Sequence, residues 1–196
     1  MSAEQYPDTH HDTSSNVIFG FWLYLMTDFI MFATFFATYA VLRDNTFGGP
    51  TGKELFNLPM ALTQTILLLT SSLTCGFASL SMERGNKRGL YFWYGVTFLL
   101  GLSFLGLIFQ DFSDLIVSGN PWSRSAFLSS YFSLIGLHGL HIVVGLLCIV
   151  FFLTQVKVRG LIPVTIRRLT CLKMFWFFSY IVWIFMFTII YLLGAI

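Results

Sequence analysis

The chain has 196 residues, of which 56% are hydrophobic and only 10% are charged, whereas soluble domains carry about 25% charged residues. The 23 phenylalanines are more than the interior of a soluble domain of this size can bury, so the composition predicts a membrane protein. A net charge of +2, without a basic cluster interleaved with aromatic residues, argues against a nucleic-acid partner.

Residues 1–16 are predicted to form a short polar tail. The segment MSAEQYPDTHHDTSSN contains no Lys or Arg, so it lacks the positively charged start of a cleavable secretory signal. We therefore expect a mature tail, followed by one membrane domain over residues 17–196.

Five continuous apolar segments follow the tail, and each is close to or above the roughly 20 residues that cross a bilayer as a helix. They cover residues 17–42, 59–82, 90–109, 126–155 and 172–194. A transmembrane barrel would instead need shorter segments of alternating polarity. The sequence therefore predicts an all-α membrane protein that folds as a five-helix transmembrane bundle.

Positive charges between the spans predict the orientation of the bundle. One side of the membrane receives eight basic residues: Arg84, Lys87, Arg88, Lys157, Arg159, Arg167, Arg168 and Lys173. The other side receives Arg43, Lys53 and Arg124. Because Lys and Arg concentrate in cytoplasmic loops, we expect a cytoplasmic N-terminus and a periplasmic C-terminus. Tryptophans near the expected span ends are predicted interface anchors: Trp22, Trp93, Trp122 and Trp176.

Asp28, in the first span, is the only charged residue deep inside a predicted span. A charge at the bilayer centre costs about 2.5 to 3.5 kcal/mol, so the carboxyl group is either protonated or partnered. The sequence offers no Lys or Arg at that depth. We expect a hydrogen bond to a histidine of the fourth span; the alternative is a neutral carboxyl group bonded to a hydroxyl group of another helix.

The segment GLHGLHIVVG, residues 136–145, places His138 and His141 near the middle of the fourth span. Three residues make almost one helical turn, so both rings project from nearly the same face. The two axial histidines of a haem lie on opposite sides of the iron, which one face does not provide. Zinc and copper sites need three or four ligands, but no third deep histidine and no CxxC motif is present. We therefore expect no cofactor or metal in this chain.

Several motifs, in order along the chain, resemble a known family. They are FGFWLYLMTD, FFATYAVL, GGPTGKELFNLP, GLHGLHIVVG and FTIIYLLG. They resemble subunit III of the haem-copper terminal oxidases, most closely that of the bacterial cytochrome o ubiquinol oxidases. The resemblance runs from about residue 17 to the end of the chain.

The resemblance implies a subunit of a respiratory-chain complex in the bacterial inner membrane. Such a complex oxidises ubiquinol, reduces oxygen to water and pumps protons. In this family the haems and copper belong to subunit I, and subunit III has no active site of its own. Subunit III packs against subunit I in a complex that also contains subunits II and IV, binds phospholipid, and supports sustained turnover and proton uptake. Asp28, His138 and His141 match the family pattern, which implies a role in helix packing or proton conduction.

Three positions depart from the family pattern. The last span reads WFFSYIVW where relatives read WHFxDxxW, so Phe177 and Tyr180 replace His and Asp. Ile108 stands at the position of a glutamate near the end of the third span, with Asp111 nearby. Tyr180 and Asp111 are therefore candidates to substitute for the missing polar groups.

The partners of the two histidines follow from these departures. Because the usual partners are missing, we expect the rings to bond to Asp28, Tyr180, a serine such as Ser133, or water. We favour a structural role in which the histidines orient the fourth span against the first, with proton conduction as a subsidiary hypothesis.

Two other functions remain open from the sequence. The chain is alternatively subunit III of a cytochrome c oxidase, because subunit III contacts neither electron donor. A small proton channel or transporter is a second alternative, against which the odd number of spans and the lack of an inverted repeat argue.

Overall fold

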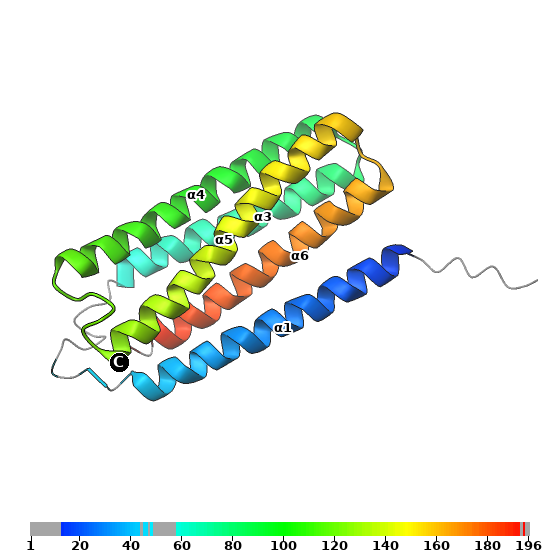
Figure 1. Cartoon of the computed structure of the whole chain (residues 1–196). Helices are drawn as coiled ribbons and strands as arrows, with labels where there is room; N and C mark the ends of the chain where they lie inside the picture. The colour runs from blue at the N-terminus through cyan, green and yellow to red at the C-terminus, as the bar shows by residue number, and fades with distance from the viewer. Residues whose placement is uncertain (1–12, 44, 47, 49–57, 193, 195–196) are drawn as a thin grey trace, which may run out of the picture.

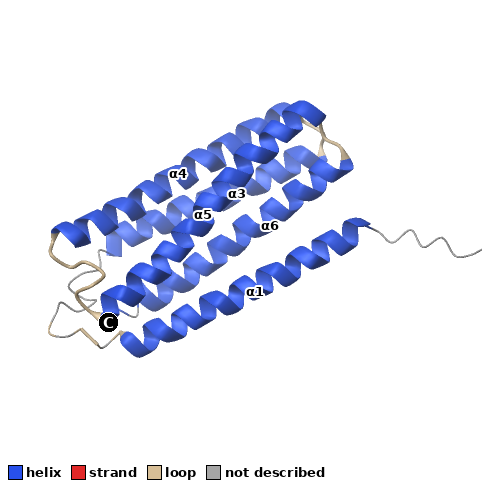
Figure 2. Cartoon of the chain, in the orientation of Figure 1, coloured by secondary structure: helices blue, strands red, loops and turns tan. Residues whose placement is uncertain are grey.

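The computed structural model describes residues 13–43, 45, 46, 48, 58–192 and 194. Its regular elements are α1 (Thr13–Leu42), α3 (Leu58–Glu83), α4 (Lys87–Val117), α5 (Ala126–Arg159), α6 (Pro163–Met186) and the π-helix η1 (Phe187–Leu192). Within these ranges every regular element is a helix (Figure 2). Five helical segments, the last of them α6 continued by η1, are long and apolar enough to cross a membrane. The predicted five-helix, all-α architecture is confirmed.

Successive helices run in opposite directions through the bundle. Figure 1 shows the start of α1 at the same end as the α3–α4 and α5–α6 connections, with the α4–α5 connection and the end of η1 at the opposite end. α1 packs against α5 and α6, whereas α3 packs mainly against α4 and α6. Short connections favour this antiparallel packing of neighbouring helices.

The last membrane helix is longer than the sequence predicts. α6 begins at Pro163 and not at residue 172, because proline in the first turn lacks only an N–H group that a helix start does not use. Arg167 and Arg168 therefore lie on α6. Trp176, expected to be an interface anchor at a helix end, lies in the middle of the helix and is only 1% exposed.

The other four helices also pass their expected boundaries, α3 by one residue at each end and α5 by four residues at its end. α4 spans Lys87–Val117 instead of residues 90–109, so Asp111 lies within the helix. Its 31 residues correspond to a length of about 47 Å, which exceeds the roughly 30 Å hydrocarbon core of a bilayer. The apolar pattern of the sequence does not detect the helical residues beyond that core. α1 begins at Thr13, inside the expected tail 1–16; the rest of that tail lies outside the described residues.

Local side-chain contacts mark the helix ends. At the start of α4, the Asn86 side chain accepts a hydrogen bond from the backbone N–H of Gly89 at 3.2 Å. The hydroxyl oxygen of Ser125 accepts one from Leu128 at the start of α5, also at 3.2 Å. Such caps satisfy N–H groups that have no partner within the helix. Gly160 ends α5 with a φ of 75°, a conformation that glycine adopts without steric cost.

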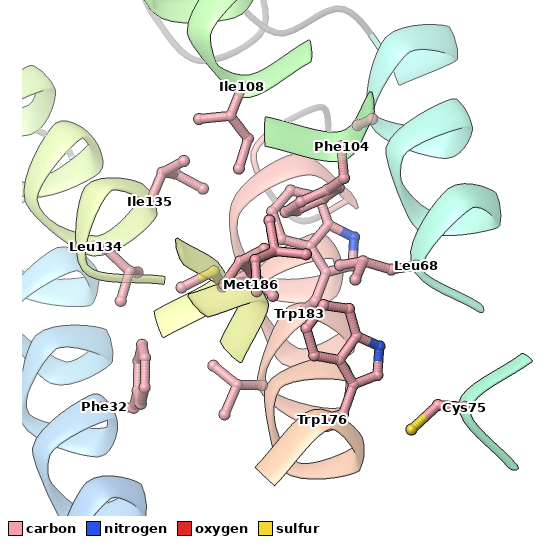
Figure 3. Packing of buried hydrophobic residues seen from close by; sticks show 14 of the residues in the cluster. Phe32, Leu68, Cys75, Phe104, Ile108, Leu134, Ile135, Trp176, Trp183 and Met186 are labelled. Carbon is pink, nitrogen blue, oxygen red and sulfur yellow. The ribbon is translucent and has the colours of Figure 1, made fainter. Parts of the chain in front are cut away.

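The core is built around two tryptophans of α6. Figure 3 shows Trp176 and Trp183 among side chains from α1, α3, α4 and α5. The indole N–H of Trp183 donates to Oγ1 of Thr65 at 3.0 Å, and that of Trp176 donates to Oγ of Ser71 at 2.9 Å. A buried N–H without an acceptor is costly, so these two bonds fix the register of α6 against α3.

The outer surface of the bundle carries large apolar side chains. Those more than half exposed include Phe19, Leu99, Phe109, Leu147 and Phe151. Exposed aromatic and aliphatic groups are suited to lipid, in which they need no burial within the protein. The many phenylalanines of the sequence are therefore divided between the core and this surface.

Candidate functional site

Asp28 lies at the middle of α1, close to α5. Its carboxyl oxygen Oδ2 is 3.8 Å from Nε2 of His141, and only 11% and 12% of the two side chains are exposed. This distance is within ion-pair range but longer than a hydrogen bond, and Oδ2 has no hydrogen-bond partner. The structure therefore brings Asp28 to a histidine of the fourth span without forming the expected hydrogen bond.

The second ring nitrogen of His141 fixes the state of the ring. Nδ1 lies 2.8 Å from the backbone carbonyl oxygen of Leu137. A carbonyl oxygen only accepts hydrogen bonds, so Nδ1 carries the hydrogen. In the neutral ring, Nε2 is then an acceptor that faces Asp28.

His138 bonds to a different helix. Its Nε2 donates to the backbone carbonyl oxygen of Ser179 on α6 at 3.0 Å, and the residue is completely buried. Nδ1 of the same ring has no hydrogen-bond partner. The two histidines therefore share a helix face but serve different contacts: His138 joins α5 to α6, and His141 faces α1.

Aromatic rings surround both histidines. The Phe32 ring of α1 lies with its centroid 5.0 Å from that of His141 and 6.5 Å from that of His138. Phe175 of α6 stacks on His141 at 6.1 Å with an interplanar angle of 16°. Phe104 of α4 places its edge against His138 at 5.7 Å. These rings keep water away and strengthen the electrostatic interactions among the polar groups between them.

The expected partners Ser133 and Tyr180 do not bond to the histidines. The Ser133 hydroxyl donates to the backbone carbonyl of Ser129 at 2.8 Å. Tyr180 packs at the edge of the hydrophobic core. The histidines bond to the backbone carbonyls of Leu137 and Ser179 instead of to the expected side chains. No sequence signal identifies these carbonyls, because every residue carries one.

Asp111 belongs to a second polar cluster, near the start of α5. Its Oδ2 accepts a hydrogen bond from the Tyr131 hydroxyl group at 2.7 Å, and the Tyr131 oxygen lies 3.0 Å from that of Tyr191. Because Tyr131 donates its single hydroxyl hydrogen to Asp111, Tyr191 is the donor to Tyr131. The chain of bonds joins η1, α5 and α4. Sequence reasoning identified Asp111 but missed both tyrosines.

The described histidines do not fit the ligand set of a haem. His138 and His141 lie on one face of α5, and each has one ring nitrogen bonded to a backbone carbonyl. A haem held by two histidines needs them on opposite sides of the iron. In the described part of the chain, no three His, Cys, Asp or Glu residues lie close enough together to hold a metal ion.

Two of the cavities that border α1 lie near the polar residues of this region. One of about 340 Å³ lies between α1 and α5, and most of its lining residues are serines and threonines, including Thr34, Thr38 and Ser133. The other, of about 190 Å³, is almost entirely apolar and is lined by residues that include Tyr24 and Phe175. Phe175 also stacks on His141, so this second cavity adjoins the Asp28–His141 pair.

Comparisons with known proteins relate the whole chain to one family. The family model described as cytochrome c oxidase subunit III matches residues 2–195. The chain is 51% identical over 189 residues to the cytochrome bo(3) ubiquinol oxidase subunit 3 of Pseudomonas aeruginosa, covering 96% of this chain and 90% of that relative. It is 45% identical over 186 residues to the subunit of the same name from Pseudomonas putida, covering 95% and 90%. It is also 37% identical over 200 residues to the cytochrome c oxidase subunit 3 of Bacillus sp. strain PS3, covering 100% and 97%.

Proposed function

Because the chain belongs to the cytochrome c oxidase subunit III family, we propose that it is subunit III of a bacterial cytochrome o ubiquinol oxidase. Such a complex of the inner membrane couples ubiquinol oxidation to oxygen reduction and proton pumping. The observation that carries the proposal is the 51% identity, over nearly the whole chain, to a ubiquinol oxidase subunit 3. The identity to a cytochrome c oxidase subunit 3 is 37%, which makes the cytochrome c oxidase the second candidate.

In the proposed complex the haem and copper reside in subunit I, and this chain has no active site of its own. Two histidines on one face of α5, each bonded to a carbonyl, support this division. The chain contributes by packing against subunit I, beside subunits II and IV, and by binding phospholipid. Its exposed apolar side chains and the apolar cavity beside Tyr24 support the lipid contact.

Asp28, His138 and His141 have a structural role in this proposal. His138 ties α5 to α6 through the Ser179 carbonyl, and the Asp28–His141 pair lies between α1 and α5. Together they orient the two helices that flank α1. Proton conduction through Asp28 is a subsidiary role, and Tyr180 and Asp111 remain candidates for the missing family groups. Asp111 has a partner in Tyr131, which favours it over Tyr180.

The proposed orientation places the N-terminal tail in the cytoplasm and the end of η1 at the periplasmic side. The eight basic residues of the α3–α4 and α5–α6 regions support it. Figure 1 shows these two connections at one end of the bundle, together with the start of α1. The division into a tail of residues 1–16 and a membrane domain of residues 17–196 belongs to the same proposal.

Affinity purification tests the assignment. The tagged chain, extracted from native membranes in mild detergent, is expected to co-purify with larger subunits that carry haem and copper. The preparation should consume oxygen with ubiquinol as donor and not with reduced cytochrome c.

The other outcomes separate the alternatives. Oxygen consumption driven only by cytochrome c would assign the chain to a cytochrome c oxidase. A colourless single chain that moves protons across vesicle membranes by itself would instead favour the channel or transporter function.

A further inference from the structure

Two hydrogen-bond acceptors face each other between α1 and α5. The Leu137 carbonyl binds the hydrogen on Nδ1 of His141, which leaves Nε2 as a lone pair in the neutral ring. Oδ2 of Asp28 lies 3.8 Å from this nitrogen and has no hydrogen-bond partner. A carboxylate oxygen and an imidazole lone pair do not attract each other. An attractive contact between them therefore requires a hydrogen on one of the two atoms.

We propose that Asp28 and His141 hold one proton in common, so that the pair is a proton-binding site joining α1 to α5. The proton resides either on Oδ2, where a neutral carboxyl group faces the Nε2 lone pair, or on Nε2, where an imidazolium faces a carboxylate. Both arrangements are uncharged overall. The inference deepens the structural role assigned to this pair and rests on the proposed function for its membrane setting.

Charge balance excludes the other two proton counts. Without a proton, the carboxylate charge would lie at membrane depth beside a second acceptor, at the cost of an unpaired charge. With two protons, a neutral acid would lie beside an imidazolium, leaving one unpaired positive charge among aromatic rings. One proton is the only count that gives the pair an attractive contact and no net charge.

The groups packed around the pair provide no counter-charge. α1 contributes the Tyr24 phenol, and α5 contributes His138 and the Cys148 thiol. α6 presents Phe175 against His141, and the Cys171 thiol lines the neighbouring cavity. Phenols and thiols are uncharged at neutral pH, and His138 is fully buried with its Nε2 hydrogen on a carbonyl oxygen.

The nearest basic side chain along α6 is directed elsewhere. Lys173 donates to the Ser79 hydroxyl group on α3 at 3.0 Å. In the described part of the chain, the ion-pair contact of Asp28 is with His141. The shared proton therefore takes the place of a basic residue.

The pair is less deeply buried than His138. The two side chains remain 11% and 12% exposed, whereas His138 is completely buried. Tyr24 interacts electrostatically with Asp28 and lines the cavity of about 190 Å³ beside the pair.

Counting protons in the purified oxidase complex tests the inference. Infrared difference spectra between the wild type and Asp28→Asn report a protonated carboxyl band that shifts in D₂O. Nitrogen-15 histidine resonances, assigned with His141→Gln, report whether one or both ring nitrogens carry hydrogen. Asp111→Asn is the control for loss of an unrelated carboxyl group. We expect either a carboxyl band with singly protonated His141, or no band with doubly protonated His141.

An ionised Asp28 beside a singly protonated His141, or a protonated Asp28 beside a doubly protonated His141, would overturn the inference at neutral pH. The proposed function fails by a different result, the recovery of a chain without haem-containing partners. A complex that contains haem and oxidises ubiquinol, but shows the wrong proton count, would therefore refute the shared proton alone.

Two variants test whether the proton joins the helices. In Asp28→Asn the amide N–H can donate to Nε2 in place of the shared proton, so the complex should keep the wild-type melting temperature. In Asp28→Leu no donor remains, and the melting temperature should fall. Equal melting temperatures for the two variants would contradict a joining role for the proton.

Discussion

Trp176 is the residue whose packing most tightly constrains its neighbours. A Cβ atom on Gly145 would lie 2.9 Å from its Cζ3, and one on Gly101 would lie 3.0 Å from its Cη2. The indole ring is therefore held between α4 and α5, and its N–H donates to Ser71 on α3. These contacts explain why glycine stands at two buried positions where larger apolar residues would otherwise suit a membrane helix.

Gly145→Ala is predicted to destabilise the protein. The added methyl group would press on Trp176, which is 1% exposed and also lies against Gly101, and overpacking of this kind costs about 1 to 3 kcal/mol. Gly136→Ala on the same helix is the matched control, because a Cβ atom there meets nothing within 4 Å. Thermal unfolding of the purified complex measures both. Equal stability of the two variants would contradict the packing of Trp176.

At the residue scale, a contact between two polar groups can be predicted from the sequence only where both groups belong to side chains. The isolation of Asp28 among apolar residues, and the HGLH spacing, were sufficient to predict that the carboxyl group approaches a histidine. The bonds of the histidines to Leu137 and Ser179 could not be predicted, because backbone acceptors have no sequence signature. Tyr131 and Tyr191 were missed because a tyrosine in a membrane span reads as an ordinary apolar or interfacial residue.

At the scale of elements, a short polar chain joins three helices at one end of the bundle. Tyr191 of η1 donates to Tyr131 of α5, which donates to Asp111 of α4. η1 is a π-helix, which is a rare form of helix in proteins. The bond from Tyr191 holds this segment against α5, so the cluster anchors the end of the last span.

Tyr131→Phe should lower the free energy of unfolding by about 1 to 3 kcal/mol, because it leaves the Asp111 oxygen and the Tyr191 hydroxyl group without this partner in a buried site. Tyr180→Phe removes the same atom from a half-buried tyrosine at the edge of the core, and should change stability little. Chemical or thermal unfolding of the complex distinguishes them. An equal loss of unfolding free energy in Tyr180→Phe and Tyr131→Phe would contradict an anchoring role for the Tyr131 hydroxyl group.

All five membrane helices could be predicted from the sequence, but some of the residues at which they begin and end could not. Apolar length alone identified all five spans, because a bilayer-crossing segment must be both long and continuous. The start of α6 was misplaced because Arg167, Arg168 and Lys173 interrupt the apolar pattern, although helical hydrogen bonding continues through them. Trp176 was misassigned as a consequence, since its place along the helix depends on where the helix begins.

At the scale of the whole molecule, the two ends of the bundle carry different connections and different numbers of basic residues. The α3–α4 and α5–α6 connections lie at one end with the start of α1, and the α4–α5 connection lies at the other (Figure 1). The antiparallel order of the helices follows from the short connections in the sequence. The arrangement of α1 on α5 and α6 does not, because the helices are apolar on most faces and periodicity does not single out a contact surface.

The proposed orientation predicts which connections a membrane-impermeant thiol reagent can reach. A cysteine introduced as Ser123→Cys, between α4 and α5, should be labelled in spheroplasts with an intact membrane. Arg84→Cys, between α3 and α4, should be labelled only after the membrane is broken. The unmodified chain, with Cys75, Cys148 and Cys171 within helices, is the background control. The reverse labelling pattern would invert the orientation.

The most direct test of the account removes the chain from the complex. Its central claim is that this protein supports a ubiquinol oxidase without holding a redox centre, so the gene is deleted and the remaining complex is purified through a tag on subunit I. Haem and copper per complex are then measured, together with the time course of ubiquinol-dependent oxygen consumption. We expect unchanged haem and copper in the assembled complex, with activity that declines faster during turnover. Loss of a haem or a copper from an otherwise assembled complex would contradict it.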